Sequence, residues 1–161
     1  IRGTLNSTAT KTRTERYINP MRGSIKPVRL RAAMKIKRAN TRRMNSRIIP
    51  SSSGIILLNY KTWGYDAIDA TRARLWVRGP SGRKVAAGFI NPSSAQRLPW
   101  DTRSKRARQA RGNAWSHRRL AMGPSAAYWF KSLSGNQTIR WVNTYLQQEF
   151  AKRMRKELLR G

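Results

Sequence analysis

The charge of the chain constrains its fold more than any other feature. Its 161 residues include 35 lysine and arginine residues but only six aspartate and glutamate residues, so the formal net charge is +29. Charge of one sign at this density repels itself and destabilises a compact chain, although it favours solubility. We therefore expect a partner with dense negative charge. The phosphate backbone of a nucleic acid is such a partner, and the release of its counterions then provides much of the affinity.

Arginine outnumbers lysine by 25 to 10. The planar guanidinium group binds a phosphate through two hydrogen bonds and stacks on exposed bases, whereas the ammonium group of lysine acts as a point charge. The excess of arginine therefore favours structured RNA as the partner over a generic polyanion.

Residue types that carry enzyme chemistry are scarce. The chain has no cysteine, one histidine (His117) and six scattered acidic residues. Catalytic and metal sites need several such groups to converge. Asp66 and Asp69 are instead expected to lie in a solvated turn or to form salt bridges with Arg72 and Arg74. We therefore expect no catalysis, no metal and no cofactor.

Two further classes of function are disfavoured by the sequence. The run from Gly79 to Lys84 has two glycines separated by only two residues, which departs from the spacing of a nucleotide-binding phosphate loop. A basic loop in which Arg83 and Lys84 contact RNA backbone fits better. The longest uninterrupted aliphatic run, residues 55–58, is far shorter than the roughly 20 residues of a membrane span.

The chain divides by composition near residue 50. All six tryptophans lie beyond residue 62, whereas residues 1–20 are polar and lack apolar periodicity. We expect residues 1–50 to form a basic RNA-threading arm, extended at first and then containing one helix, and residues 51–161 to form one small globular domain. The expected fold class is mostly α, with room for one short β-hairpin.

Four segments have recognisable local patterns. Good helix formers predict a helix within residues 27–47. Residues 65–76 fit a short helix, but apolar runs on either side of residues 78–83 also fit a β-hairpin, and both readings stay open. Residues 124–133 predict a short aromatic helix. Apolar residues recur every fourth position in the final segment, which predicts an amphipathic helix; they are Val142, Leu146, Phe150, Met154 and Leu158.

The candidate RNA contacts are basic residues in three groups, together with one tryptophan. Trp115 lies among arginines, so it either stacks an unpaired base or packs in the core, and both interpretations stay open. The arm contributes Arg13, Arg16, Arg22, Lys26, Arg29, Arg31, Lys35, Lys37, Arg38, Arg42, Arg43 and Arg47. The central loop contributes Arg83 and Lys84. The densest cluster contributes Arg103, Lys105, Arg106, Arg108, Arg111, Arg118 and Arg119.

The basic tail over residues 1–47, the cluster over residues 103–119 and the basic terminal helix together resemble mitochondrial ribosomal proteins as a class. The resemblance spans the chain but contains no diagnostic motif. It implies a structural constituent of an organellar ribosome that binds ribosomal RNA and neighbouring ribosomal proteins.

The expected location is the mitochondrial matrix, with another organelle as second choice. The chain begins at Ile1 without an initiator methionine, so either a presequence has been removed or the sequence given starts late. The acid-poor beginning fits a transit peptide, and it equally fits an RNA-threading tail. An organellar DNA-packaging protein and a basic assembly subunit of a membrane complex are the alternatives.

Overall fold

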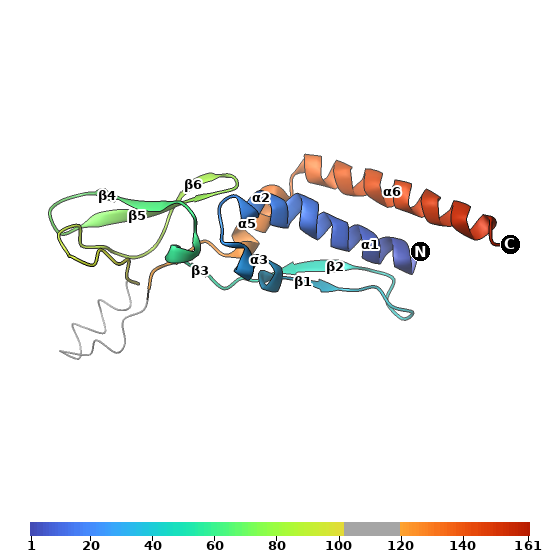
Figure 1. Cartoon of the computed structure of the whole chain (residues 1–161), viewed down its shortest axis with the longest axis horizontal. Helices are drawn as coiled ribbons and strands as arrows, with labels where there is room; N and C mark the ends of the chain where they lie inside the picture. Colours follow the sequence, from blue (N-terminus) through green and yellow to red (C-terminus); the bar gives the residue numbers. More distant parts are fainter. Residues whose placement is uncertain (102–119) are drawn as a thin grey trace. The chain divides into compact units, whose positions relative to one another are not determined.

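The chain forms two compact units with a mixed α/β structure. Figure 1 shows the computed structural model, which describes residues 1–101 and 120–161, the side chains of Val28 and Arg29 excepted. Unit 1 comprises residues 1–22, 27–52 and 126–161, and unit 2 comprises residues 23–26 and 53–125. The described residues are 43% helical and 24% strand, with three small antiparallel sheets. The expectation of a mostly α fold with an extended arm was therefore wrong.

The N-terminal segment of unit 1 is helical where the sequence predicted an extended arm. Threonine and serine are weak helix formers, so packing must stabilise this helix. Thr4, Thr8 and Thr12 recur every fourth residue and are buried on one face. Figure 1 shows the first helix running alongside the last one, with which it packs. The N-terminal helices are α1 (Arg2–Thr12), a π-helix η1 (Arg13–Ile18) and α2 (Asn19–Arg22).

The two C-terminal helices lie where the sequence predicted a short aromatic helix and a final amphipathic helix. They are α5 (Ala126–Leu133) and α6 (Asn136–Leu158), and Trp129 of α5 is 2% exposed in the core of unit 1. In η1, Tyr17 stacks on Phe130 of α5 with ring centroids 4.1 Å apart, and its hydroxyl lies 2.8 Å from the hydroxyl oxygen of Ser134. These contacts join the two ends of the chain.

The apolar stripe of α6 is less buried than its period predicts. Val142 and Leu146 are half-buried, but Phe150 and Met154 are 43% and 46% exposed. At this end of the helix the neighbouring α1 offers small polar side chains. The polar contact there comes from Arg153, which donates hydrogen bonds to Ser7 Oγ (2.7 Å) and to Glu149 Oε1 (2.8 Å).

The helix predicted within residues 27–47 ends after seven residues. It is α3 (Pro27–Ala33), and the chain continues as β1 (Met34–Lys37), which pairs in antiparallel fashion with β2 (Arg47–Pro50). Ile36 lies directly opposite Ile48. Such β-branched pairs favour a pleated strand. The prediction that the helix continues beyond Ala33 was therefore wrong.

Unit 2 is built on a three-stranded antiparallel sheet. The strands are β4 (Trp63–Ala67), β5 (Ala73–Gly79) and β6 (Gly82–Val85), in that order. The hairpin prediction is therefore confirmed and the competing helix over residues 65–76 is wrong. Ala73, Leu75 and Val77 alternate into the core, which is the period of a strand rather than of a helix.

The turn between β4 and β5 is ordered by Asp69. Its carboxylate accepts hydrogen bonds from the backbone N–H groups of Thr71 (2.9 Å) and Arg72 (2.8 Å) and pairs with the Arg72 side chain at 2.6 Å. The N–H of Thr71 first, and then the Arg72 side chain, lower the pKa of Asp69 to about 2. The expected salt bridge of Asp69 is thus confirmed.

Described residues outside this sheet add to the core of unit 2. Leu57, Leu75 and Ile90 are fully buried. Gly88 has a φ of +143°, and a Cβ there would lie 2.7 Å from the Trp100 carbonyl oxygen, so only glycine fits. The remaining elements are β3 (Ile55–Ile56), which pairs with β7 (Met122–Gly123), and a 3₁₀ turn η2 (Leu57–Asn59).

Candidate nucleic-acid interface

The β1–β2 hairpin of unit 1 presents basic side chains on its outer face. Met34 is fully buried and Ile36 and Ile48 are half-buried, whereas the alternate residues Lys35 and Lys37 are exposed. Arg47 is also exposed and lies directly opposite Lys37 in the register. Like charges on directly opposed residues destabilise a strand pair. The hairpin therefore has an electrostatic cost that a bound anion would remove.

The connecting loop over residues 38–46 is anchored to α1 by one asparagine. The Asn6 side chain accepts a hydrogen bond from the backbone N–H of Ala39 (2.7 Å) and donates one to the carbonyl of Ala39 (3.1 Å). It also accepts a hydrogen bond from the hydroxyl of Ser46 (2.6 Å). Both ends of the loop are thus fixed to the first helix.

A second asparagine shapes the tip of the same loop. The side-chain oxygen of Asn40 accepts hydrogen bonds from the backbone N–H groups of Arg42 (3.0 Å) and Arg43 (2.8 Å). This turn, which a short polar side chain favours, places two exposed arginines next to each other at the tip. The basic tip is therefore ordered before any ligand binds.

An open groove of about 650 Å³ lies beside the loop. Arg38 is exposed on its rim, and Lys11 and Arg153 contribute two more cations, which are paired with Glu15 and Glu149. Hydroxyl groups line much of the remainder. Cations and hydroxyls are the groups that bind phosphate and sugar oxygens. The hydroxyl-bearing residues of the groove are Ser7, Thr10, Thr14 and Tyr145.

Arg13 is partly buried beside this cationic surface and contacts the start of β1. Its guanidinium donates a hydrogen bond to the carbonyl of Met34 at 3.3 Å, where β1 begins. Burial first, and then the positive charges of Arg31 and Arg38, lower the pKa of Arg13. Arg31 and Arg38 are thus close enough to Arg13 to repel it.

The acidic residues of unit 1 are already paired. The unit contains 20 basic residues against three acidic ones. Glu15, Glu149 and Glu157 pair with Lys11, Arg153 and Arg160 on the helices. Within the described part of the chain, no ion pair therefore neutralises the six exposed cations of the hairpin, which we call the basic hairpin cluster: Lys35, Lys37, Arg38, Arg42, Arg43 and Arg47.

The other sequence-predicted residues are dispersed. Arg16 donates hydrogen bonds to the hydroxyl of Thr138, which makes it a structural contact. Arg22 and Arg31 are exposed in unit 1, and Lys26 is exposed in unit 2. Arg29 belongs to α3, and its side chain lies outside the described part.

The remaining predicted residues form two groups. Arg83 and Lys84 belong to β6 of unit 2, where Arg83 pairs with Asp66, the acid that the sequence had assigned to Arg72 or Arg74. The densest predicted cluster lies outside the described residues: Arg103, Lys105, Arg106, Arg108, Arg111, Trp115, Arg118 and Arg119.

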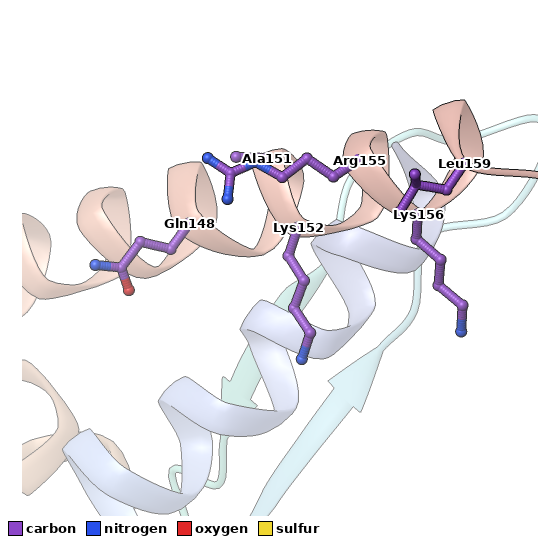
Figure 2. Close-up of a pocket in the computed structure, with 6 residues that line it drawn as sticks. All are labelled: Gln148, Ala151, Lys152, Arg155, Lys156 and Leu159. Carbon is purple, nitrogen blue, oxygen red and sulfur yellow. The ribbon is translucent and has the colours of Figure 1, made fainter.

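Sequence reasoning left the last turns of α6 out of the candidate set. Figure 2 shows Lys152 and Lys156 extending to the same side of the helix from successive turns, while the Arg155 side chain runs back along the helix. All three are exposed and form no ion pair with a described residue. The dense basic run of residues 152–156 was the available signal. Arg74 and Arg78, which are exposed on β5, were missed as well.

Two kinds of feature are absent from the described residues. In residues 1–101 and 120–161, histidine, aspartate and glutamate side chains do not gather in groups of three that could bind a metal. Over the same residues, no helix has both the length and the apolar character required to cross a bilayer. The comparisons with protein-family models, curated proteins and solved structures found no match to this chain.

Proposed function

We propose that the protein binds ribosomal RNA as a structural constituent of an organellar ribosome, in the first place a mitochondrial one. The observation that carries this proposal is the basic hairpin cluster, which contains six exposed cations and no acid and belongs to a hairpin whose loop is fixed by Asn6. A cationic hairpin of this kind suits contact with phosphate backbones, where each cation releases counterions.

RNA is favoured over duplex DNA by the character of the surface. Arginines dominate the cluster, and the adjoining groove has several hydroxyls and Arg38 on its rim. Proteins distinguish RNA largely by its shape and its 2′-hydroxyl groups, which side-chain hydroxyls recognise through hydrogen bonds. Exposed Phe150, Met154 and Leu158 on α6 provide an apolar surface for a neighbouring ribosomal protein.

The first experiment measures the salt dependence of RNA binding. Replacing Arg42, Arg43 and Arg47 together by glutamine should make the negative slope of log affinity against log salt less steep by about two units. Each phosphate contact contributes about 0.7–0.9 to the steepness of this slope. The control is Arg160→Gln, whose side chain is exposed and already paired with Glu157. An unchanged slope in the triple variant would exclude the hairpin as an RNA contact.

The second experiment tests the assembly. The tagged full-length chain should co-sediment with ribosomes from a mitochondrial lysate in a sucrose gradient, leave them at high salt and shift after ribonuclease treatment. In competition, structured ribosomal RNA should displace duplex DNA from the purified protein. Stronger binding to duplex DNA, together with no co-sedimentation, would contradict the ribosomal role and favour DNA packaging.

A further inference from the structure

The β4–β5–β6 sheet of unit 2 has one face in the core and one face outside. Arg74, Trp76 and Arg78 alternate with the buried residues of β5, so they share the outer face. Their cross-strand partners belong to the same face, because directly opposed residues in an antiparallel pair point the same way. We call this surface the open face; it comprises Gly64, Asp66, Arg74, Trp76, Arg78, Arg83 and Val85.

A stacked cation lies at the centre of the open face. The guanidinium carbon of Arg83 is 4.1 Å from the centroid of the Trp76 ring, and its end pairs with Asp66 on the far strand. Gly64 lies opposite Trp76, and a Cβ there would be only 2.6 Å from the indole ring. Glycine thus gives the ring the room to lie against the sheet, and Arg83 crosses the central strand above it.

The Arg83 guanidinium is fixed and still accessible. The ring beneath it and the carboxylate at its end determine the plane of the group, while its side chain remains 48% exposed. A guanidinium plane fixed in this way is a stacking platform for an unpaired base, because arginine stacks on bases as aromatic side chains do. The conformational entropy of the Arg83 side chain is therefore lost on folding and not on RNA binding.

The same face has more positive charge than it can neutralise. Arg78 lies directly opposite Arg83, and the only acid of the open face, Asp66, is paired with Arg83. Arg74 and Arg78 are exposed and form no ion pair with a described residue. A strand pair with opposed like charges gains stability when an anion binds between them.

We propose that the open face binds single-stranded RNA, with one unpaired base stacked on the outer side of the Arg83 guanidinium and Arg74 and Arg78 in contact with the flanking phosphates. This inference rests on the proposed RNA-binding function and adds the class of RNA that unit 2 recognises. Duplex RNA does not fit, because its base faces are covered by their neighbours in the stack.

The decisive variant is Arg83→Lys in the full-length chain. Lysine retains the charge but lacks the planar group, so stacking is lost while phosphate attraction remains. Affinity for a short single-stranded RNA should fall about five- to tenfold, with the salt slope unchanged and the affinity for a duplex of the same sequence unaltered. The matched variant Arg74→Gln with Arg78→Gln should instead lower the salt slope by about one to two units.

A second measurement follows base stacking directly. Single-stranded RNA that contains one 2-aminopurine should lose fluorescence on binding to the wild-type protein, since stacking quenches this base, and Arg83→Lys should restore part of the signal. Binding of wild-type protein without quenching, or equal affinity of Arg83→Lys for the single strand, would overturn the inference and leave the hairpin proposal intact. Absence of any RNA binding would overturn both.

Discussion

The basic hairpin of unit 1 and the open face of unit 2 both contain opposed cations, but they differ in whether an acid pairs with one of them. Each contains two cations directly opposed across a strand pair, Lys37 with Arg47 and Arg78 with Arg83. In unit 2, Asp66 pairs with one of the two cations. In unit 1, no described acid pairs with either. This difference supports our proposal that an external anion binds the hairpin, whereas the sheet uses an internal acid to orient one arginine.

The two regions also differ in what supports them. The open face is the outer side of a three-stranded sheet whose inner side contains fully buried Leu75 and Val77. The hairpin has only two strands, and a two-stranded ribbon is at best marginally stable by itself. Its strand β2 also packs against α5, and its loop is held to α1 by Asn6.

The largest expected effects on the free energy of unfolding distinguish buried residues from exposed residues in each region. Leu75→Ala and Met34→Ala remove fully buried side chains and should each lower the free energy of unfolding by about 2–5 kcal/mol. The adjacent exposed substitutions Arg74→Ala and Lys35→Ala should change it by about 0.5 kcal/mol or less. Urea denaturation of the four variants measures the contrast. Equal losses for the inner and the outer residue would contradict the strand registers.

The next effect tests the dependence of the hairpin on α1. Asn6→Ala removes the side-chain partner of the buried Ala39 carbonyl and leaves the Ala39 N–H only its longer hydrogen bond to Ser46 (3.2 Å), so it should cost about 1–3 kcal/mol. It should also weaken RNA binding, because the basic tip is no longer ordered. Exposed Asn143→Ala is the control. Hydrogen exchange should become faster in residues 38–46 only. Unchanged exchange there would show that the loop is ordered without Asn6.

A smaller effect concerns the last turns of α6. Phe150→Ala should cost about 1–2 kcal/mol, below the 3–5 kcal/mol of a fully buried ring, because 43% of the residue is exposed. Arg153→Ala should cost about 1 kcal/mol or less, since its ion pair with Glu149 is partly exposed. Thermal unfolding monitored by circular dichroism tests both. A loss of 3 kcal/mol or more for Phe150→Ala would mean that the ring is covered in solution.

Local patterns predicted the helices near the C-terminus and the hairpin at β5–β6. The period of four from Val142 onward and the alternation of Ala73, Leu75 and Val77 depend on near neighbours in the sequence, so they are readable without the fold. Burial of Phe150 was not readable in this way. It depends on which residues of α1 lie opposite, and these are more than 100 positions away.

The errors at the N-terminus have a single physical origin. Polar threonines predict an extended segment by propensity, but α1 is stabilised by packing against α6 at the other end of the chain. The strand Met34–Lys37 likewise depends on residues 47–50. In the candidate site, charge alone predicted all six cations of the hairpin cluster. It did not predict Arg74 and Arg78, because their shared face exists only once β5 pairs with β4 and β6.

The smallest effect in stability is the sharpest test of the comparison between the two regions. Lys37→Thr removes one of two opposed cations and introduces a better strand former, so it should raise the stability of the free protein by about 0.2–1 kcal/mol. The same substitution should reduce the salt slope of RNA binding by about 0.7–0.9. Stability and binding would thus change in opposite directions.

Arg78→Thr provides the matched change in unit 2. Its opposed partner Arg83 is already paired with Asp66, so the gain in stability should be smaller than for Lys37→Thr. Denaturant unfolding of both variants in the absence of RNA measures the difference. Equal gains would mean that Asp66 does not offset the repulsion in the sheet. A loss for Lys37→Thr would mean that the opposed cations of the hairpin carry no cost. In that case, the free protein would have no electrostatic strain for RNA to relieve, and an external anion would not be needed to complete the hairpin.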